Sequence, residues 1–494
     1  MNALLTPAVL ISWLLAPYLV AFLGALLPAL GEVPFLLCCL ATGLIGAHGL
    51  IDGDVRTLML LGDHGVMLQF DPIAAWFLLL NALVMMAVRL DQWRDPGRCS
   101  PLLPAVLLGG LNTCFVVSDL ISLYVALEVV GIAAFLLIQR DGSQRMLWIG
   151  LRYLLISNTA MTLYLVGAGL AYAVTGSFRF SSLTALPLGA AEVLLLLGLI
   201  TKAGLFLPGL WLPRSHAEAP SDVSALLSGV VVTGGAAPLL HLAAVDASLL
   251  PLLRMVGLGS TVFGIGQALA AADLKRLLAW STVSQMGLVV LSPMTGGAVA
   301  LAHGLAKAPL FLMAGRIQQR QLRGWQDRGL PLSLQLPLWI GSLSIAGAPL
   351  LAGFSAKKEL DATLPAFWAA AATLSGIGSV ALFARIWGAP VQTGDSNHRS
   401  QLGNGLPLGS SLLLVVVVGG GLLGAARGLL TPLDLLTTAL LFAAGLGLHL
   451  LLQRPRQTIA ERSPQLESLQ DLIGNIAVVG AALLLAVNLM EARG

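Results

Sequence analysis

Charged residues are scarce in this chain. Of its 494 residues only 10% are Asp, Glu, Lys or Arg, whereas 57% are hydrophobic and the mean hydropathy is +0.88. Such a composition cannot present the polar surface of a water-soluble globular protein. The formal net charge of +3 is too small and too scattered to indicate a nucleic-acid partner. The sequence therefore predicts an integral membrane protein.

Cysteine is also scarce, and the motifs that hold redox groups are missing. The four cysteines, Cys38, Cys39, Cys99 and Cys114, lack the paired spacing of an iron–sulfur cluster, a structural zinc site or a disulfide framework. The sequence has no Gly-rich phosphate loop after a strand and no flavin or nicotinamide motif. We therefore expect no cofactor, no metal and no catalytic residues, which favours a transport protein over an enzyme.

Apolar runs long enough to cross a bilayer, about 17 to 25 residues each, follow one another through the chain. They are continuously apolar and do not alternate at period two as the strands of an outer-membrane barrel would. The sequence predicts an all-α polytopic fold in one membrane domain, 1–494, with about 14 to 16 helices. The candidate spans are 7–30, 34–51, 72–90, 101–118, 119–138, 147–175, 189–211, 222–243, 248–271, 277–293, 296–315, 330–354, 364–387, 405–426, 431–452 and 471–490.

Basic residues concentrate in every second loop, from residues 89–98 to residues 454–462. The positive-inside rule makes these loops cytoplasmic, and an even number of spans places both termini on the outer side. Lys275 and Arg276 are interpreted as topology anchors of this kind. The membrane is expected to be a bacterial cytoplasmic (inner) membrane or an internal energy-converting membrane.

Four ionisable residues, Glu128, Lys202, Lys307 and Lys357, lie inside or at the edge of these apolar runs. An unpaired charge at this depth costs several kcal/mol and by default indicates an ion or proton path. Simpler interpretations stay open, because Glu128 could be a hydrogen-bonded carboxylate and Lys357 could snorkel at a helix end, as Lys358 is expected to do.

Two of the lysines lie next to helix breakers. Pro208 follows Lys202, and Pro349 precedes Lys357, each with glycines nearby. Proline removes a backbone hydrogen bond, and broken helices at membrane depth occur where they line a cavity. We therefore expect two interrupted helices, each with an ammonium group beside freed carbonyls. Two such helices in corresponding positions indicate an inverted-repeat transporter core.

Four runs of sequence carry a family resemblance. They are WLPxxHxEAPxxVSALLSG at 211–229, DLKRLLAWSTVSQMG at 273–287, HGLAK at 303–307 and GFSAK at 353–357. In this order they resemble the antiporter-like proton-translocating membrane subunits shared by complex I, membrane-bound hydrogenases and Mrp-type cation:proton antiporters. The resemblance runs from residue 101 to residue 386, and overall length makes the chain most similar to the D-type subunit of the Mrp antiporters.

The resemblance implies a fold and a set of roles. The fold is two inverted-repeat halves of five helices, 101–243 and 248–387, each with one discontinuous helix, followed by C-terminal accessory helices at 405–490. Glu128 and Lys202 match the family's switchable ion pair. A lysine in low dielectric loses its proton unless a carboxylate holds it charged, so separating the pair can eject a proton. Lys307, beside His303, matches the central relay, and Lys357 matches the exit-side residue.

Two positions depart from the family pattern. Thr233 stands where relatives commonly carry a lysine or histidine, and His241 where an arginine is usual. A threonine can hold a water but cannot store a proton near neutral pH. Either a longer water chain makes a modified path here, or the chain has lost conduction. His303 could also be a packing residue. His216 and Glu218 are expected in a cytoplasmic loop, capping the next helix or shaping access to the path.

Several functions follow from these observations. The first is a proton-translocating subunit of a multisubunit Na⁺/proton antiporter, with other membrane subunits, the lipid bilayer, protons and Na⁺ as partners. The alternatives are a proton-pumping membrane subunit of an NAD(P)H:quinone oxidoreductase or hydrogenase complex without its own redox centre, a component of an inorganic-carbon uptake system, and a scaffold that has lost conduction.

Overall fold

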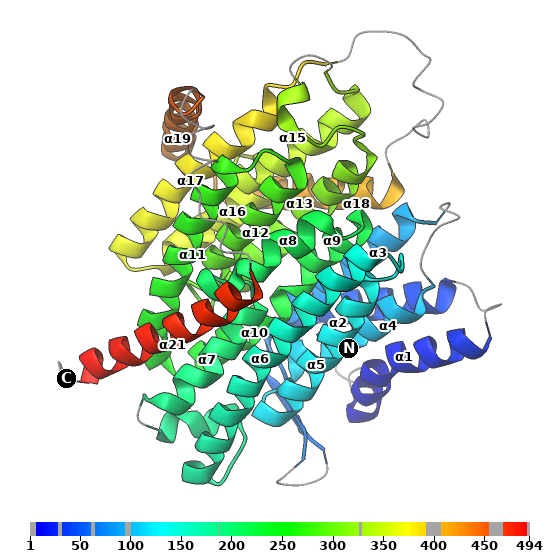
Figure 1. Cartoon of the computed structure of the whole chain (residues 1–494), viewed down its shortest axis with the longest axis vertical. Helices are drawn as coiled ribbons and strands as arrows, with labels where there is room; N and C mark the ends of the chain where they lie inside the picture. The colour runs from blue at the N-terminus through cyan, green and yellow to red at the C-terminus, as the bar shows by residue number, and fades with distance from the viewer. Residues whose placement is uncertain are drawn as a thin grey trace.

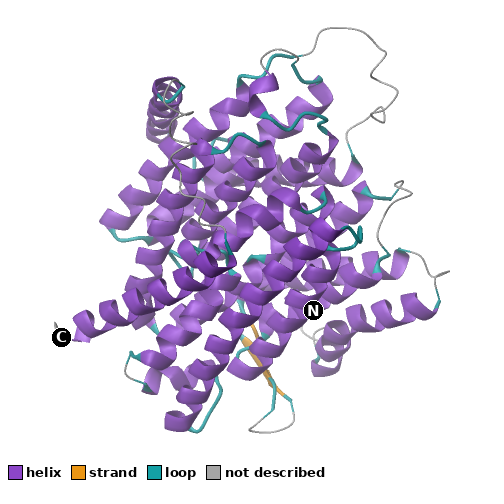
Figure 2. Cartoon of the chain, in the orientation of Figure 1, coloured by secondary structure: helices purple, strands orange, loops and turns teal. Residues whose placement is uncertain are grey.

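The computed structural model describes residues 6–27, 32–60, 65–93, 100–186, 188–325, 329–391, 407–453 and 468–491. Cys99 and much of the basic sequence at 94–98, 392–406 and 454–462 lie outside these ranges. Within them the chain is a bundle of helices (Figures 1 and 2), and thirteen are long and apolar enough to cross a membrane. Two shorter apolar helices, Leu102–Val116 and Leu332–Ala346, lie among them. The predictions of an all-helical class and of an integral membrane protein are confirmed.

The first half of the chain contains α1 (Pro7–Leu26), α2 (Val33–Asp52), β1 (Arg56–Met59), β2 (Met67–Phe70), α3 (Pro72–Asp91), α4 (Leu102–Val116), α5 (Leu120–Ile138), α6 (Gln144–Thr175), η3 (Phe180–Ala185), α7 (Ala190–Lys202), η4 (Leu207–Leu210), α8 (Trp211–Glu218), α9 (Ser221–Leu226), η5 (Leu227–Val231) and α10 (Thr233–Val245). The second half contains η6 (Ala247–Leu249), α11 (Leu250–Ala270), α12 (Leu274–Val289), α13 (Gly296–Arg316), η7 (Leu322–Gly324), α15 (Leu332–Ala346), α16 (Ala352–Thr363), α17 (Ala366–Trp387), α18 (Leu408–Ala426), α19 (Pro432–Leu451) and α21 (Leu469–Glu491).

A small antiparallel hairpin, β1–β2, stands at one end of the bundle (Figure 2) and was not predicted. It pairs Arg56 with Phe70 and Met59 with Met67. The backbone nitrogen of Met67 donates to Asp119 Oδ2 at 3.1 Å, and Asp119 Oδ1 caps α5. The hairpin therefore closes the turn between α4 and α5, where the backbone groups of a short connection need partners.

Two helices are interrupted inside the bundle, where the sequence predicted interruptions. The first ends at Lys202, and its path resumes in η4 and α8. Gly204 there has a φ of +67° and Phe206 a φ of +48°, which a β-carbon disfavours. The second interruption separates α15 from α16, with Gly347 at φ +92° and Leu350 at φ +64°. Positive φ at a non-glycine residue in both breaks is the kind of strain that persists at functional sites.

Glycine rather than proline sets where the first helix ends. α7 stops at Lys202, before Pro208, which lies in the first turn of the short helix η4. A β-carbon on Gly209 would lie 2.2 Å from the Gly204 carbonyl carbon, so the two glycines let the backbone fold back on itself. Pro17, Pro238, Pro309 and Pro337 stand within helices that continue past them.

The C-terminal helices pack on different parts of the bundle. α18 packs against α3, α13 and α16, whereas α21 crosses α6 and α7 (Figure 1). α19 lies at the edge of the bundle beside α17 (Figure 1), and most of its side chains are exposed. These helices therefore contact both interrupted regions.

Close packing at the first break predicts that a larger residue at Gly235 lowers the stability of the fold. A β-carbon on Gly235 of α10 would lie 2.5 Å from the Ala203 nitrogen, directly after the end of α7. Gly235→Ala is therefore expected to lower the free energy of unfolding by about 1–3 kcal/mol through overpacking. Thermal denaturation in detergent measures this. Gly266→Ala on α11 is the matched control because its β-carbon would meet nothing within 4 Å, and equal melting temperatures for the two variants would contradict the overpacking.

Candidate functional site

The first charged pair joins α5 to the end of α7. Lys202 Nζ lies 3.6 Å from Glu128 Oε1 and donates to the Leu127 carbonyl oxygen at 3.1 Å. With its amide turned to satisfy its neighbours, Asn158 donates to Glu128 Oε2 at 3.1 Å. Lys202 is buried and Glu128 is partly exposed. The lysine thus has one carboxylate at a loose distance and one backbone carbonyl, an arrangement in which a small movement separates the charges.

The helix end and a glycine make room for this pair. Lys202 is the last residue of α7, and the Trp211 indole donates to the Thr201 carbonyl at 2.7 Å. A β-carbon on Gly131 would stand 3.2 Å from Lys202 Nζ. A larger residue on this face of α5 would crowd the ammonium group, so the backbone there approaches the charge directly.

Thr233 lies on α10 directly after a π-helical turn, η5. It is fully buried, and its hydroxyl donates to the Val230 carbonyl at 2.6 Å. The hydroxyl oxygen of Ser228 in η5 lies 2.7 Å from that of Thr282 in α12, and this hydrogen bond joins the two elements. A single π turn in a helix is frequently a functional feature. Polar groups therefore continue from Thr233 toward α12, although neither Ser228 nor Thr282 was singled out from the sequence.

Lys307 is fully buried in the middle of α13. Its ammonium donates to the Leu278 carbonyl at 2.5 Å and to the Ser281 hydroxyl, both on α12. In the part of the chain that the structure describes, Lys307 has no ion pair with a carboxylate. A buried lysine held only by neutral oxygens can give up its proton more readily than one held by a carboxylate.

The expectation for His216 is wrong. It lies on α8 rather than in a cytoplasmic loop, and it is fully buried. Its ring centroid is 6.0 Å from that of Trp211 and 6.2 Å from that of Phe311. It is also near enough to Lys307 for their charges to interact. Sequence reasoning missed this position because α8 is short and resumes only after a break, so its polar residues resemble a loop.

A small cavity connects His303 on α13 with Lys357 on α16. Gln285 and Ser344 complete its polar lining, and its volume is about 10 Å³. One water needs roughly 10–15 Å³ of such volume, so the space matches a single water. Lys357 donates to the Ile345 carbonyl at 2.6 Å, which is a freed carbonyl at the end of α15.

His241 lies apart from this line. Its Nε2 is 3.1 Å from Asp71 Oδ1, and both residues are buried. Asp71 caps α3 by accepting from Ala74 N at 2.8 Å. Burial alone would raise the pKa of Asp71, but His241 and the donors from Ala74 and Gln69 outweigh it and hold that pKa below its usual value.

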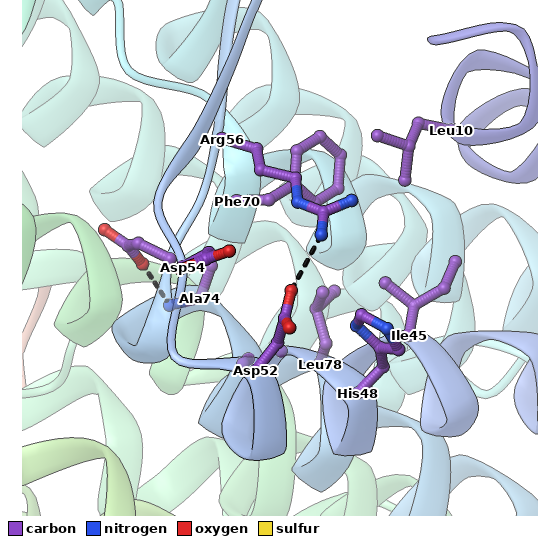
Figure 3. Close-up of a pocket in the computed structure, with 12 residues that line it drawn as sticks. Leu10, Ile45, His48, Asp52, Asp54, Arg56, Phe70, Ala74 and Leu78 are labelled. Atoms are coloured by element: carbon purple, nitrogen blue, oxygen red, sulfur yellow. Dashed lines mark hydrogen bonds and ion pairs between the residues drawn. The ribbon is translucent and has the colours of Figure 1, made fainter. Parts of the chain in front are cut away.

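Asp71 also lines a cavity of about 30 Å³ near the hairpin end of the bundle. Figure 3 shows Asp52 and Arg56 pointing toward one another there, with His48 beside them. Arg56 Nη2 lies 2.7 Å from Asp52 Oδ2. His241 therefore belongs to this end of α10, and its described partner is Asp71.

Near the end of α3 that lies away from the hairpin, charged residues gather around the junction of α8 and α9. Asp222 accepts from Arg140 and Gln92, and Glu218 pairs with Arg145 at 2.5 Å. Lys275 is almost completely buried and donates to the Ala219 carbonyl at 2.5 Å. Lys275 is thus a packed residue of this junction, and its interpretation as a topology anchor stays a prediction. Glu218 is correspondingly the last residue of α8 and not a loop residue.

The chain is similar in sequence to known proteins. The family model described as NADH:quinone oxidoreductase/Mrp antiporter, TM, matches residues 117–382. The N-type subunit of the NADH-quinone oxidoreductase of Desulforudis audaxviator is 31% identical over 392 residues, covering 70% of this chain and 78% of that protein. The D-type subunit of the Na⁺/H⁺ antiporter of Alkalihalophilus pseudofirmus is 31% identical over 308 residues, covering 56% of this chain and 62% of that protein.

Solved structures share the fold. A chain of the Mrp complex from Dietzia sp. superposes with a TM-score of 0.69 at 22% identity, covering 93% of this chain and 99% of that chain. A chain of an archaeal membrane-bound sulfane sulfur reductase gives a TM-score of 0.73 at 19% identity, covering 94% and 99%. The chain therefore belongs to the family of membrane subunits common to NADH:quinone oxidoreductases and Mrp antiporters.

Proposed function

We propose that the chain is the proton-translocating subunit of a multisubunit monovalent-cation/proton antiporter. The observation that carries the proposal is a line of buried and partly buried ionisable groups, which begins at the Glu128–Lys202 pair and continues through Lys307 and His303 to Lys357. Buried charges inside a membrane domain are costly and are retained where they act on ions or protons. The two breaks place one lysine of the line at each interrupted helix.

Transfer starts at the charge pair. When Glu128 moves away or takes up a proton, Lys202 loses the carboxylate that holds it charged, and its proton is released toward α10. Thr233 and the Ser228–Thr282 hydroxyls then hold water rather than storing the proton themselves. His216 adds an imidazole close to Lys307, in a chain that lacks a lysine or histidine at position 233.

The second half continues the path from Lys307 through His303 to Lys357. We infer that residues 101–243 and 248–387 are the two inverted-repeat halves, each contributing one interrupted helix. His241 supports the start of α3 through Asp71 and does not carry the proton. The basic ends of α3, α13 and α17 then face the cytoplasm.

A second function is favoured by one comparison. The Desulforudis relative belongs to an NADH-quinone oxidoreductase, and the match covers 78% of its length, against 62% for the relative from the Alkalihalophilus antiporter. In that case the same line would pump protons with energy from redox partners. Gene neighbours separate the two, since small antiporter subunits would support the first function and redox subunits the second.

The functional test uses the assembled complex. The chain and its neighbouring genes are expressed in an antiporter-deficient bacterial strain, and the ΔpH of everted membrane vesicles is followed on addition of Na⁺, Li⁺ or K⁺. Collapse of a preformed ΔpH by one of these cations is the expected result. Vesicles that contain the complex and respond to none of the three cations would contradict antiport and favour the redox-linked function.

A further inference from the structure

Lys357 separates two cavities. It is the residue common to the linings of the small cavity beside His303 and of a second cavity between α16, α17 and α19. The second cavity has a volume of about 100 Å³, and roughly 10–15 Å³ suffices for one water. Its polar wall includes Lys358, Asp361, Thr373 and Asp434. Several waters therefore fit on the side of Lys357 that faces away from His303.

Asp361 is the carboxylate placed to take the next proton. It follows Lys357 by one helical turn on α16, so both side chains share one face of that helix. The Thr373 hydroxyl of α17 donates to Asp361 Oδ2 at 2.8 Å and fixes the carboxylate in the cavity wall. Asp361 is only partly buried, so its other oxygen can exchange protons with water.

A second carboxylate comes from a C-terminal helix. Lys358 forms an ion pair with Asp434 of α19. Asp434 also accepts from the Thr431 backbone nitrogen at 3.0 Å and from the Thr431 hydroxyl at 2.6 Å, in a capping box at the start of α19. Further along, α19 contacts α17 through a stacked ring pair, Trp387–Phe442, with centroids 5.9 Å apart. The ion pair thus fixes the first turn of α19 against the cavity.

We propose that Asp361 carries the proton onward from Lys357 and that the Lys358–Asp434 ion pair sets the charge of the second cavity, here called the exit cavity. This inference rests on the proposed function. In the transfer, an N–H bond of the Lys357 ammonium breaks and an O–H bond forms on Asp361, directly or through a cavity water. Asp361 then gives the proton to water at the mouth of the cavity. No electron moves and no other reactant is consumed.

The charges around the cavity nearly balance. The ionisable groups that line the two cavities are Lys357, Lys358, Asp361, Asp434 and His303, and Glu359 and Arg427 lie beside them. Glu359 faces Arg427 and does not line the cavity. Removing the negative charge of Asp434 leaves the positive charge of Lys358 without its partner, and this positive charge disfavours the protonated forms of Lys357 and Asp361. Removing the positive charge of Lys358 favours those protonated forms.

Three variants and their pH profiles test this exit. Cation-dependent ΔpH is measured in everted vesicles across external pH, with the amount of assembled complex checked in each preparation. Asp361→Asn is expected to lower the rate about tenfold or more, because the amide cannot carry a proton. Glu359→Gln is the matched control on the same helix and should keep the wild-type rate and profile.

The ion pair predicts shifts of opposite sign. Asp434→Asn should move the pH profile toward acid by about one unit, and Lys358→Met toward alkali by a similar amount. The double variant should return it close to the wild-type position. An Asp361→Asn complex with the wild-type rate, or pair variants that lose rate without moving the profile, would overturn the inference alone. A wild type without any cation response would overturn the proposed function and this inference with it.

Discussion

Replacing Lys307 with methionine is expected to abolish proton transfer while leaving the complex assembled. Lys307 is fully buried, and among the described residues its ammonium donates to the Leu278 carbonyl and the Ser281 hydroxyl. Methionine has a similar length and removes a costly buried charge, so stability should be unchanged or higher. Removing the central proton carrier should reduce the cation-dependent ΔpH rate by roughly a hundredfold. The rate in everted vesicles and the melting temperature of the purified complex measure the two effects.

Lys307→Arg distinguishes proton transfer from a requirement for charge alone. Arginine keeps the positive charge but does not release its proton in proteins. We therefore expect this variant to be as inactive as Lys307→Met. Substantial activity in the arginine variant would show that a fixed positive charge suffices at this position, and the relay role of Lys307 would have to be abandoned.

Glu128 and Lys202 are expected to act as one unit. Glu128→Gln removes the charge that holds Lys202 protonated, and Lys202→Met removes the proton carrier itself. Each single variant should lose the cation-dependent ΔpH signal by at least about tenfold. Because the two residues perform one step, the double variant should lose little more than either single variant.

Residual rates in the four forms of this double-mutant cycle supply the measurement. Losses that multiply in the double variant would mean that the two residues act independently, against the pair. Asn158→Leu is a useful companion, because Asn158 contacts Glu128 Oε2 without carrying a proton. It should weaken transport less than Glu128→Gln does.

The sequence predicts the parts of the fold that depend on local composition. Apolar run length places most of the spans, since a bilayer fixes the length of a helix that crosses it. The predicted span 330–354 is wrong in its second part, because α15 ends at Ala346 and α16 occupies Ala352–Thr363. Glycine and proline near Lys202 and Lys357 indicate both interruptions. The end of α7 differs in detail, because the left-handed backbone at Gly204 ends the helix before Pro208 is reached.

Features made by contacts between distant segments are not predictable in this way. His216 is buried because α8 packs against α6 and α12 and the Phe311 ring of α13 lies beside the imidazole. The Lys358–Asp434 pair joins residues 76 positions apart on helices that no local pattern relates. The hairpin β1–β2 has strands of only four residues each, too short for a periodic signal.

The central claim is that one continuous line through both halves moves the proton. The most direct measurement compares cation-dependent ΔpH in everted vesicles for Lys202→Met and Lys357→Met, one substitution at each interrupted helix, at equal amounts of assembled complex. A continuous line predicts that either substitution alone abolishes the signal. A wild-type signal in one of the two variants would contradict it, because a single half would then be sufficient for transport.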